Sequence, residues 1–500
     1  MTRQELYQQI VGVPRFLAPS RVRALVRFSE IGLTVVAALI GAISGLAVTA
    51  MRATAQLLHQ IVFSISAGQA LSAAPDISRQ ALIAGPVTGG LLMGGILYAM
   101  ARWRKAAIID PIEANALHGG RMSLFDSFIL VCQNLVSNGF GASVGLEAGY
   151  TQISSGLASR IGLALETRRN DLRTLVGCGA AAAIATAFNA PLAGAFYGFE
   201  LIIGSYSIAT LTPVIVAAIS GTIVSRLIVG NTFPVDLGVF GGITNADYVP
   251  AFVLGIIAAA LGILIMQGVT LVERFARFAV KPAPLRPLLG GLIVGGLATI
   301  SSEVLSAGHG ALRLHLEAET PALALLLILG LKSAASAVSI GSGFRGGLFF
   351  ASLLIGTILG KLFSIGAPYF FASSTLTPSI YAMVGMSAMA VAIIGGPLTM
   401  TFLALETTGN FQITVLVLVG VIASSVTVRK TFGYSFATWR FHLRGESIRS
   451  AHDIGWIRNL TVGKLMRRDV RTARDDMTVA VFRRDFPLGS TQRAVVTDLE

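Results

Sequence analysis

Residues 189–200 read NAPLAGAFYGFE, and residues 395–406 read GGPLTMTFLALE. The two stretches share a proline, the leucine after it and a final glutamate, which pairs Pro191 with Pro397, Leu192 with Leu398 and Glu200 with Glu406. Upstream, GLEAG at 145–149 lies opposite GLFFA at 347–351, at a spacing of 202 residues against 206 for the first pair. Two matched landmarks in the same order indicate an internal repeat. The sequence therefore predicts a fold made of two related halves.

The composition is that of a membrane protein. Of the 500 residues, 54% are hydrophobic and 13% are charged, and the mean hydropathy is +0.73. Soluble proteins carry about 25% charged residues. The runs 31–50, 251–272 and 411–428 are almost free of charge over lengths close to the ~20 residues that cross a bilayer. We expect an all-α polytopic protein whose partner is the lipid bilayer, and repeated short or interrupted segments are typical of a transporter's binding site.

The net charge of +13 does not indicate nucleic-acid binding. Basic residues gather at the N-terminus, in the short loops 102–105 and 168–173, and in the tail after Arg429. This distribution is what the positive-inside rule gives for cytoplasmic loops. No nucleic-acid partner is expected.

Three regions are predicted along the chain. Residues 1–24 are a cytoplasmic N-terminal segment, 25–445 the membrane domain, and 446–500 a cytoplasmic linker with part of a soluble α/β domain. In this tail we predict a strand–helix–strand order, in which TVGKLM (461–466) is followed by a helix in DDMTVAVFRRDF (475–486) and a strand in RAVVTDL (493–499).

One carboxylate stands in the glycine-rich stretch GFGASVGLEAGYTQ, residues 139–152. A helix that begins near Glu147 would leave its first N–H groups unpaired, and such an end binds anions. A tethered carboxylate there could occupy the anion site itself and leave when protonated. Glu147 could instead be an ordinary capping acid, but its repeat partner is Phe349 in an equally glycine-rich turn, which favours the functional interpretation.

Taken in order, these segments resemble the CLC family of anion channels and proton-coupled anion antiporters, over about residues 30–445. GLEAGYTQ is similar to that family's G-R-E-G-P segment, and the resemblance implies that Glu147 is the external gate and proton acceptor. It also implies that Gly145, Leu146 and Ala148 line the anion site. GSGFRGGLFFASLLIGTILG (341–360) resembles the G-G-x-F-x-P segment, which places Phe349 and Phe350 where backbone amides line the anion path.

The resemblance also implies an architecture. About 18 interrupted and tilted helical segments would form two inverted-topology halves, and the protein would be a homodimer with one pore per subunit. The tail resembles the start of a CBS domain, where a nucleotide is a possible ligand. We expect a multi-pass protein of the bacterial inner (plasma) membrane with a cytoplasmic tail. No HExxH, paired CxxC or P-loop occurs, so no metal or other cofactor is expected.

The sequence departs from the family at the inner anion site. The family's G-S-G-I-P loop corresponds to AIIDP, residues 107–111, which puts Ile108 at the serine position and Ile109 after it. The pore tyrosine falls within YSFATWRFHLRG, where the best alignment gives Phe436, with Tyr434 two residues away. Both side-chain hydroxyls are therefore missing, and the anion could be chloride or another small inorganic anion such as bicarbonate, nitrate or fluoride. Asp110 is the only residue that favours bicarbonate, which carries its own donor.

The proton route also departs from the family. The position of the inner proton-transfer glutamate is Leu201, so protons would use Glu200, water or another residue. For Glu200 a proton path and a structural hydrogen bond are equally open, whereas we expect Glu406 to be structural.

Four further residues could contribute to anion binding or be ordinary polar residues. Arg345 could attract anions or be a solvated loop charge, and Lys332 could attract anions or be a snorkelling cation or counter-charge. We expect His118 and His309 to be ordinary surface residues.

We therefore predict proton-coupled antiport of a small inorganic anion, gated by Glu147. The alternative is a passive voltage- or pH-gated anion channel on the same scaffold. An intramembrane enzyme using Glu147 and His118 as an acid–base pair is disfavoured because no nucleophile motif or metal-ligand set accompanies them. A receptor whose tail senses a nucleotide is a fourth hypothesis.

Overall fold

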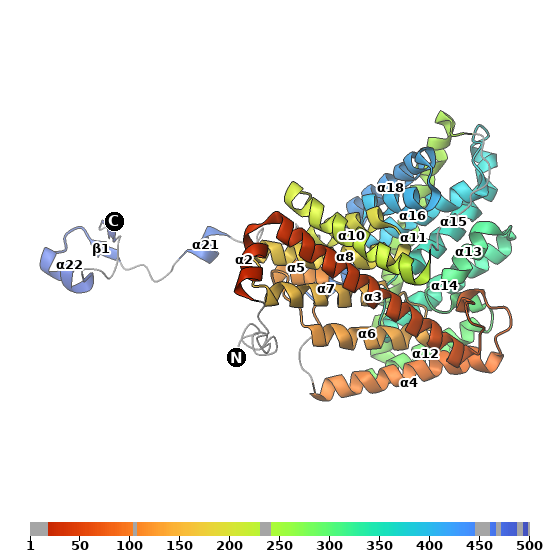
Figure 1. The fold of residues 1–500 in the computed structure, drawn as a ribbon, viewed down its shortest axis with the longest axis horizontal. Coiled ribbons are helices and arrows are strands. Elements are labelled where there is room, and N and C mark those ends of the chain that lie inside the picture. The colour runs from red at the N-terminus through yellow and green to blue at the C-terminus, as the bar shows by residue number, and fades with distance from the viewer. Residues whose placement is uncertain are drawn as a thin grey trace. The chain divides into compact units, whose positions relative to one another are not determined.

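The computed structural model describes residues 19–103, 108–230, 242–445, 461–466, 472–487 and 494–498. Most of the predicted N-terminal segment, 1–24, lies outside these ranges. The chain divides into two compact units, residues 1–453 and 454–500, and each is considered by itself. In its described residues the first unit is built from helices (Figure 1).

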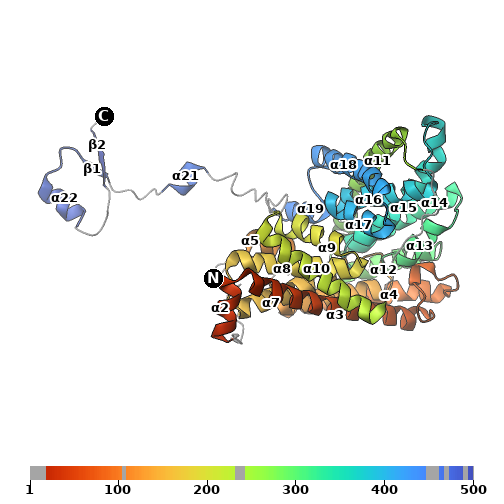
Figure 2. The ribbon, with the colours of Figure 1, turned by 45° about the horizontal axis from the view of Figure 1, so that its top comes forward.

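The first half of this unit carries the helices α2 to α10. Their bounds are α2 Ser20–Phe28, α3 Glu30–Phe63, α4 Arg79–Trp103, α5 Pro111–Leu117, α6 Leu124–Gly139, α7 Glu147–Ala164, α8 Arg169–Phe188, α9 Pro191–Tyr197 and α10 Ile208–Val229. A π-helical turn, Gly198–Ile203, continues α9. Helices α3 and α10 lie side by side (Figure 2), and they approach so closely that a Cβ on Gly41 would lie 2.2 Å from the carbonyl oxygen of Ala217.

The second half carries α11 to α19. Their bounds are α11 Tyr248–Ala279, α12 Arg286–Ala298, α13 His309–Glu317, α14 Ala322–Ser342, α15 Phe349–Phe370, α16 Pro378–Ile394, α17 Pro397–Thr408, α18 Phe411–Thr431 and α19 Phe436–Leu443. The connections hold four 3₁₀ turns, Leu71–Ala73, Asn245–Asp247, Ala283–Leu285 and Ser302–Val304. The run α7–α8–α9–α10 has its counterpart in α15–α16–α17–α18, as the sequence repeat predicts.

Within the described residues, 8 helices are long and apolar enough to cross a membrane. Several others are shorter, among them the continuous stretch Pro191–Ile203 and the helix Pro378–Ile394. The combination of full spans and short helices confirms the predicted polytopic all-α fold with interrupted elements.

The two halves break their helices in the same way. The C-cap residues of α8 and α16 are Asn189 and Gly395, and both adopt the left-handed conformation, with φ of 54° and 87°. A proline then starts the next helix in each half, Pro191 in α9 and Pro397 in α17. Proline fits this position because its fixed φ suits the first turn and its missing N–H needs no partner there.

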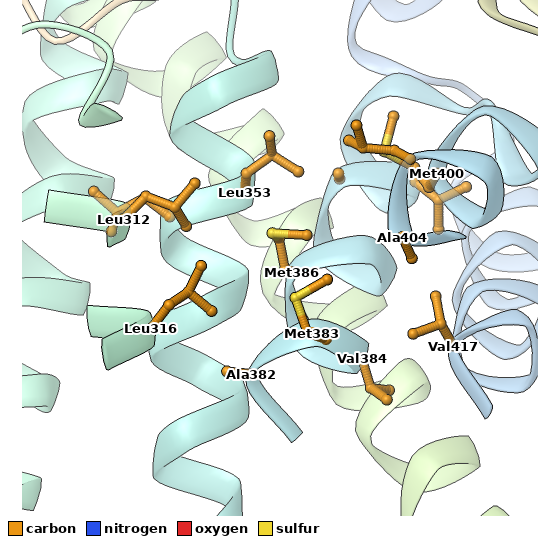
Figure 3. Packing of buried hydrophobic residues seen from close by; sticks show 14 of the residues in the cluster. Leu312, Leu316, Leu353, Ala382, Met383, Val384, Met386, Met400, Ala404 and Val417 are labelled. Atoms are coloured by element: carbon orange, nitrogen blue, oxygen red, sulfur yellow. The ribbon is translucent and has the colours of Figure 1, made fainter. Parts of the chain in front are cut away.

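The largest hydrophobic cluster packs α13, α15, α16, α17 and α18 together. Figure 3 shows its centre, where Leu353 of α15 lies near Met383 and Met386 of α16. On the same interface Gly356 and Gly385 face each other, and a Cβ on either would lie 2.4 Å from the other's carbonyl oxygen. Glycine at both positions lets the two backbones touch, as in other tightly packed membrane helices.

The second unit is a small α/β piece. Its elements are α21 Val462–Leu465, β1 Thr472–Arg474, α22 Val479–Asp485 and β2 Val495–Thr497, and β1 pairs with β2 in parallel. The predicted helix and last strand are confirmed, although the helix is shorter than expected. The prediction of a strand at TVGKLM is wrong: Val462 and Leu465, spaced by three residues, form one helical turn, and the first strand is Thr472–Arg474.

Candidate functional site

The site is centred on the first residue of α7. Leu146 precedes the helix as its N-cap without contributing a side-chain cap, and Glu147 begins the helix, as predicted. The Glu147 side chain is buried, with 4% of its surface exposed. Its Oε2 atom has no hydrogen-bond partner among the described residues. A buried carboxylate oxygen without a partner is costly, and groups of this kind mark functional sites in membrane proteins.

A pair of backbone hydrogen bonds joins the two glycine-rich turns. The Gly145 N–H donates to the Gly347 carbonyl at 2.9 Å, and the Gly347 N–H donates to the Gly145 carbonyl at 3.2 Å. This antiparallel bridge stands immediately before α7 and α15, so the N-terminal ends of both helices meet at one point. Two such ends present unpaired N–H groups and positive dipole ends to the same small volume.

The carboxyl of Glu147 lies over this bridge. A Cβ on Gly145 would lie 1.9 Å from its Oε2 atom, whereas a Cβ on Gly347 would lie 3.7 Å from the same atom. The carboxylate thus fills the space that a side chain at residue 145 would need. Ala148 follows in the first turn of α7 and is half-buried.

Helix α6 fixes the geometry of both turns through an asparagine. The Asn134 amide donates to the carbonyls of Gly145 (3.0 Å) and Arg345 (3.1 Å), and its Oδ1 accepts from the Gly149 N–H at 2.9 Å. The neighbouring Ser137 hydroxyl accepts from the Arg345 N–H at 3.0 Å. Sequence analysis did not single out these residues. The signal was present, because a run of polar residues in an otherwise apolar helix needs internal partners.

At the other end of the site stands α5. Asp110 caps this helix, and its Oδ1 accepts from the Glu113 N–H at 2.9 Å. Ile108 and Ile109 are half-buried just before it. The carbonyl of Ile109 accepts from the Gln152 side chain at 3.0 Å, which ties this turn to α7. Asp110 therefore occupies the N-terminal end of α5, where an anion would otherwise bind.

Aromatic rings line the beginning of α15. Phe349 and Phe350 are buried, and the ring of Phe188 lies 4.7 Å and 5.9 Å from theirs, centroid to centroid. The exposed ring of His309, predicted as an ordinary surface residue, stacks on Phe350 at 3.7 Å. Phe436 starts α19 and packs against the cluster of buried residues that includes Val144 and Leu348.

Glu200 and Glu406 exchange contacts between the halves. The Glu200 carboxylate accepts from the N–H groups of Leu398 and Thr399, both at 2.9 Å, and from the Thr399 hydroxyl at 2.7 Å. The Glu406 carboxylate accepts from the N–H groups of Leu192 (2.8 Å) and Ala193 (2.9 Å). Each acid caps the broken helix of the opposite half. For Glu200 these contacts favour the structural interpretation, and its role in proton transfer stays a prediction.

Three other residues considered in the sequence analysis, Lys332, Arg345 and His118, have defined surroundings. The Lys332 ammonium is fully buried and donates to the carbonyls of Val304 (3.1 Å) and Ser306 (2.8 Å), so it holds the loop before α13 rather than snorkelling. Arg345 is half-buried in its turn. His118 is the C-cap of α5, and its Nε2 lies 3.9 Å from the Oε1 atom of Glu113.

These features define a membrane protein with a buried carboxylate where two helix N-termini converge. Comparison with known proteins identifies it further: a family model for voltage gated chloride channels matches residues 89–429, and the chain belongs to this family, the CLC family.

Curated relatives agree over most of the chain. A ClcB-like chloride channel protein of Ralstonia nicotianae is 33% identical over 408 residues, covering 79% of this chain and 93% of that protein. A voltage-gated ClC-type chloride channel, ClcB, of Salmonella dublin is 30% identical over 407 residues, covering 79% and 95%.

Solved structures show the same fold. A slow cyanobacterial Cl⁻/H⁺ antiporter aligns with a TM-score of 0.72 and 23% identity, covering 82% of this chain and 97% of that one. A CLC-type fluoride/proton antiporter aligns with a TM-score of 0.65 and 19% identity, covering 79% and 95%. At these identities the likeness establishes the fold, and the transported anion is a separate question.

Proposed function

We propose that the protein exchanges a small inorganic anion for protons across the membrane, and that Glu147 is both the gate and the proton acceptor. In the closed state its carboxylate occupies the place of an anion beside the first N–H groups of α15. Protonation removes the charge, the side chain leaves, and an anion takes its place. Chloride is the first candidate, and bicarbonate, nitrate and fluoride are the others.

The observation that carries this proposal is the unpartnered Oε2 atom of Glu147 beside the Gly145–Gly347 bridge. A purely structural capping acid uses its oxygens, as Glu200 and Glu406 do here. Glu147 keeps one oxygen unpartnered in a buried place where helix ends favour a negative charge. A carboxylate with this surrounding is suited to leave and return.

A proteoliposome experiment tests the proposal. Vesicles holding the full chain are loaded with chloride, bicarbonate, nitrate or fluoride in turn, and anion efflux and external pH are recorded together. We expect one anion gradient to drive protons uphill in the wild type. In Glu147→Gln proton movement should be lost while anion flux remains, because the amide keeps the shape of the side chain but does not titrate in this range.

A matched control is Glu317→Gln, since Glu317 is an exposed acid whose partner is Arg313. This variant should exchange anions and protons as the wild type does. Absence of transport for all four anions would contradict the proposal as a whole. Loss of proton movement in Glu317→Gln as well would show that the assay, rather than residue 147, is responsible.

A passive anion channel is the second candidate function, and the observation that favours it is Leu201 at the position of the inner proton-transfer glutamate. A channel dissipates an anion gradient without moving protons uphill. With chloride, nitrate or fluoride the same recording separates the two, because anion efflux without any pH change in the wild type would identify the channel and leave Glu147 as a gate alone.

The setting of this function is also proposed. We infer a homodimer in a bacterial inner membrane, with one anion path in each subunit and the tail in the cytoplasm. The distribution of basic residues supports this orientation. Nucleotide binding to the β–α–β tail is proposed on its likeness to the start of a CBS domain.

A further inference from the structure

Tyr197 is the last residue of α9, and sequence analysis did not select it. Its ring lies between two parts of the candidate site. On one side it packs against a buried cluster that includes Ala114 of α5, and Ile109 and Ile112 pack against the same cluster. On the other side its centroid lies 6.2 Å from the ring of Phe349, the first residue of α15. Tyr197 is half-buried at this position.

The Tyr197 hydroxyl lies within hydrogen-bonding reach of the Thr151 side chain. Thr151 stands one turn into α7 and donates to the carbonyl of Glu147 at 3.0 Å. Through Thr151 the hydroxyl lies beside the first turn of α7, and the ring lies beside the first residue of α15.

An anion that has lost its water needs hydrogen-bond donors on every side. The best alignment with the CLC motifs puts Ile108 and Phe436, which carry no hydroxyl, at the positions of that family's two side-chain hydroxyls, with Tyr434 two residues from the second. The N-terminal end of α5 is not a free donor set either, since Asp110 already occupies it. Among the described residues around this point, Tyr197 brings a neutral hydroxyl that can turn its hydrogen toward an anion.

We propose that the Tyr197 hydroxyl is the side-chain donor of the anion site, and that the anion binds between it and the N-terminal ends of α7 and α15. This inference rests on the proposed anion transport. The site would lie on the gate side of Asp110, because the carboxylate at α5 repels an anion placed at that helix end. Selectivity would then depend on α9, an element that the family motifs do not mark for this role.

Removal of the hydroxyl tests the inference. Tyr197→Phe and Tyr197→Met both lose it while filling the space differently. We expect the anion concentration for half-maximal efflux to rise about tenfold or more in both, because a hydrogen bond to a charged group is lost. The maximal rate and the melting temperature should change little. The matched control is Tyr248→Phe, at the start of α11, which should leave the half-maximal concentration unchanged.

The measurement uses chloride, nitrate, fluoride and bicarbonate in vesicles that hold the full chain. A half-maximal concentration unchanged in both Tyr197 variants would overturn the inference, whereas wild-type transport would leave the proposed function standing. A lower maximal rate at an unchanged half-maximal concentration would also overturn it, since that pattern reports packing around the gate. If the wild type moves none of the four anions, the proposed function fails first.

Discussion

At the residue scale, the informative feature is how two glycines of one bridge differ. Gly145 and Gly347 occupy equivalent places in the two halves and bond to each other. A side chain at residue 145 would collide with the Glu147 carboxylate, while one at residue 347 would make ordinary contact. The repeat is thus symmetric in its backbone and asymmetric in its chemistry.

This asymmetry makes a prediction. Gly145→Ala should displace the Glu147 carboxyl from the anion site, because the new Cβ would lie 1.9 Å from its Oε2 atom. We expect faster anion efflux and fewer protons moved per anion, as if the gate were held open. The proteoliposome recording checks it, with Gly347→Ala as the matched variant, where the nearest contact is 3.7 Å. Equal behaviour of the two variants would refute the assignment.

At the element scale, two short helices are capped by acids of the opposite half. Glu200, in the turn that continues α9, caps α17, and Glu406 of α17 caps α9. A broken helix leaves N–H groups without partners inside the membrane, where water cannot satisfy them. Glu200 and Glu406 supply those partners from the opposite half. The acids at the ends of the two matched sequence segments thus have one shared purpose.

A paired substitution separates this capping role from proton transfer. Glu200→Gln and Glu406→Gln should each lower the free energy of unfolding by about 1–3 kcal/mol, since one charged acceptor is replaced by a neutral amide. Thermal unfolding in detergent would measure this loss. We expect the number of protons moved per anion to stay unchanged in both. A changed ratio in Glu200→Gln alone would assign Glu200 to the proton path.

Sequence analysis predicted the elements that follow from the internal repeat and from residues that start or end helices. The start of α7 at Glu147 and the prolines that begin α9 and α17 belong to this class. It missed Tyr197 and Asn134, because their importance comes from contacts between segments far apart in the chain. It misassigned TVGKLM, since six residues cannot distinguish a short strand from one helical turn by apolar spacing.

At the scale of the whole molecule, the chain divides into a membrane unit and a tail. The hydrophobic clusters of buried residues all lie in the membrane unit, and in the described tail only Ala473 and Phe486 are buried hydrophobic residues. The tail therefore adds little apolar packing of its own.

Deletion of residues 454–500 tests what the tail contributes to the membrane unit. We expect the shortened chain to keep the melting temperature and the anion efflux of the full chain, because the clusters that hold the membrane unit together are intact. Differential scanning fluorimetry and the proteoliposome recording check both. A large fall in the melting temperature would show that the tail stabilises the membrane unit. Loss of efflux at an unchanged melting temperature would indicate regulation.

The crossed contacts of Glu200 and Glu406 have a consequence for motion. Many transporters expose their site alternately by rocking one repeat against the other. Here such rocking would have to break several charge-assisted hydrogen bonds at once, each worth about 1.5–3 kcal/mol. These hydrogen bonds hold the two halves together, so under the proposed function the moving part of the transport cycle would be the Glu147 side chain. Turnover should then depend on how readily that side chain gains a proton, and little on the viscosity of the surrounding lipid.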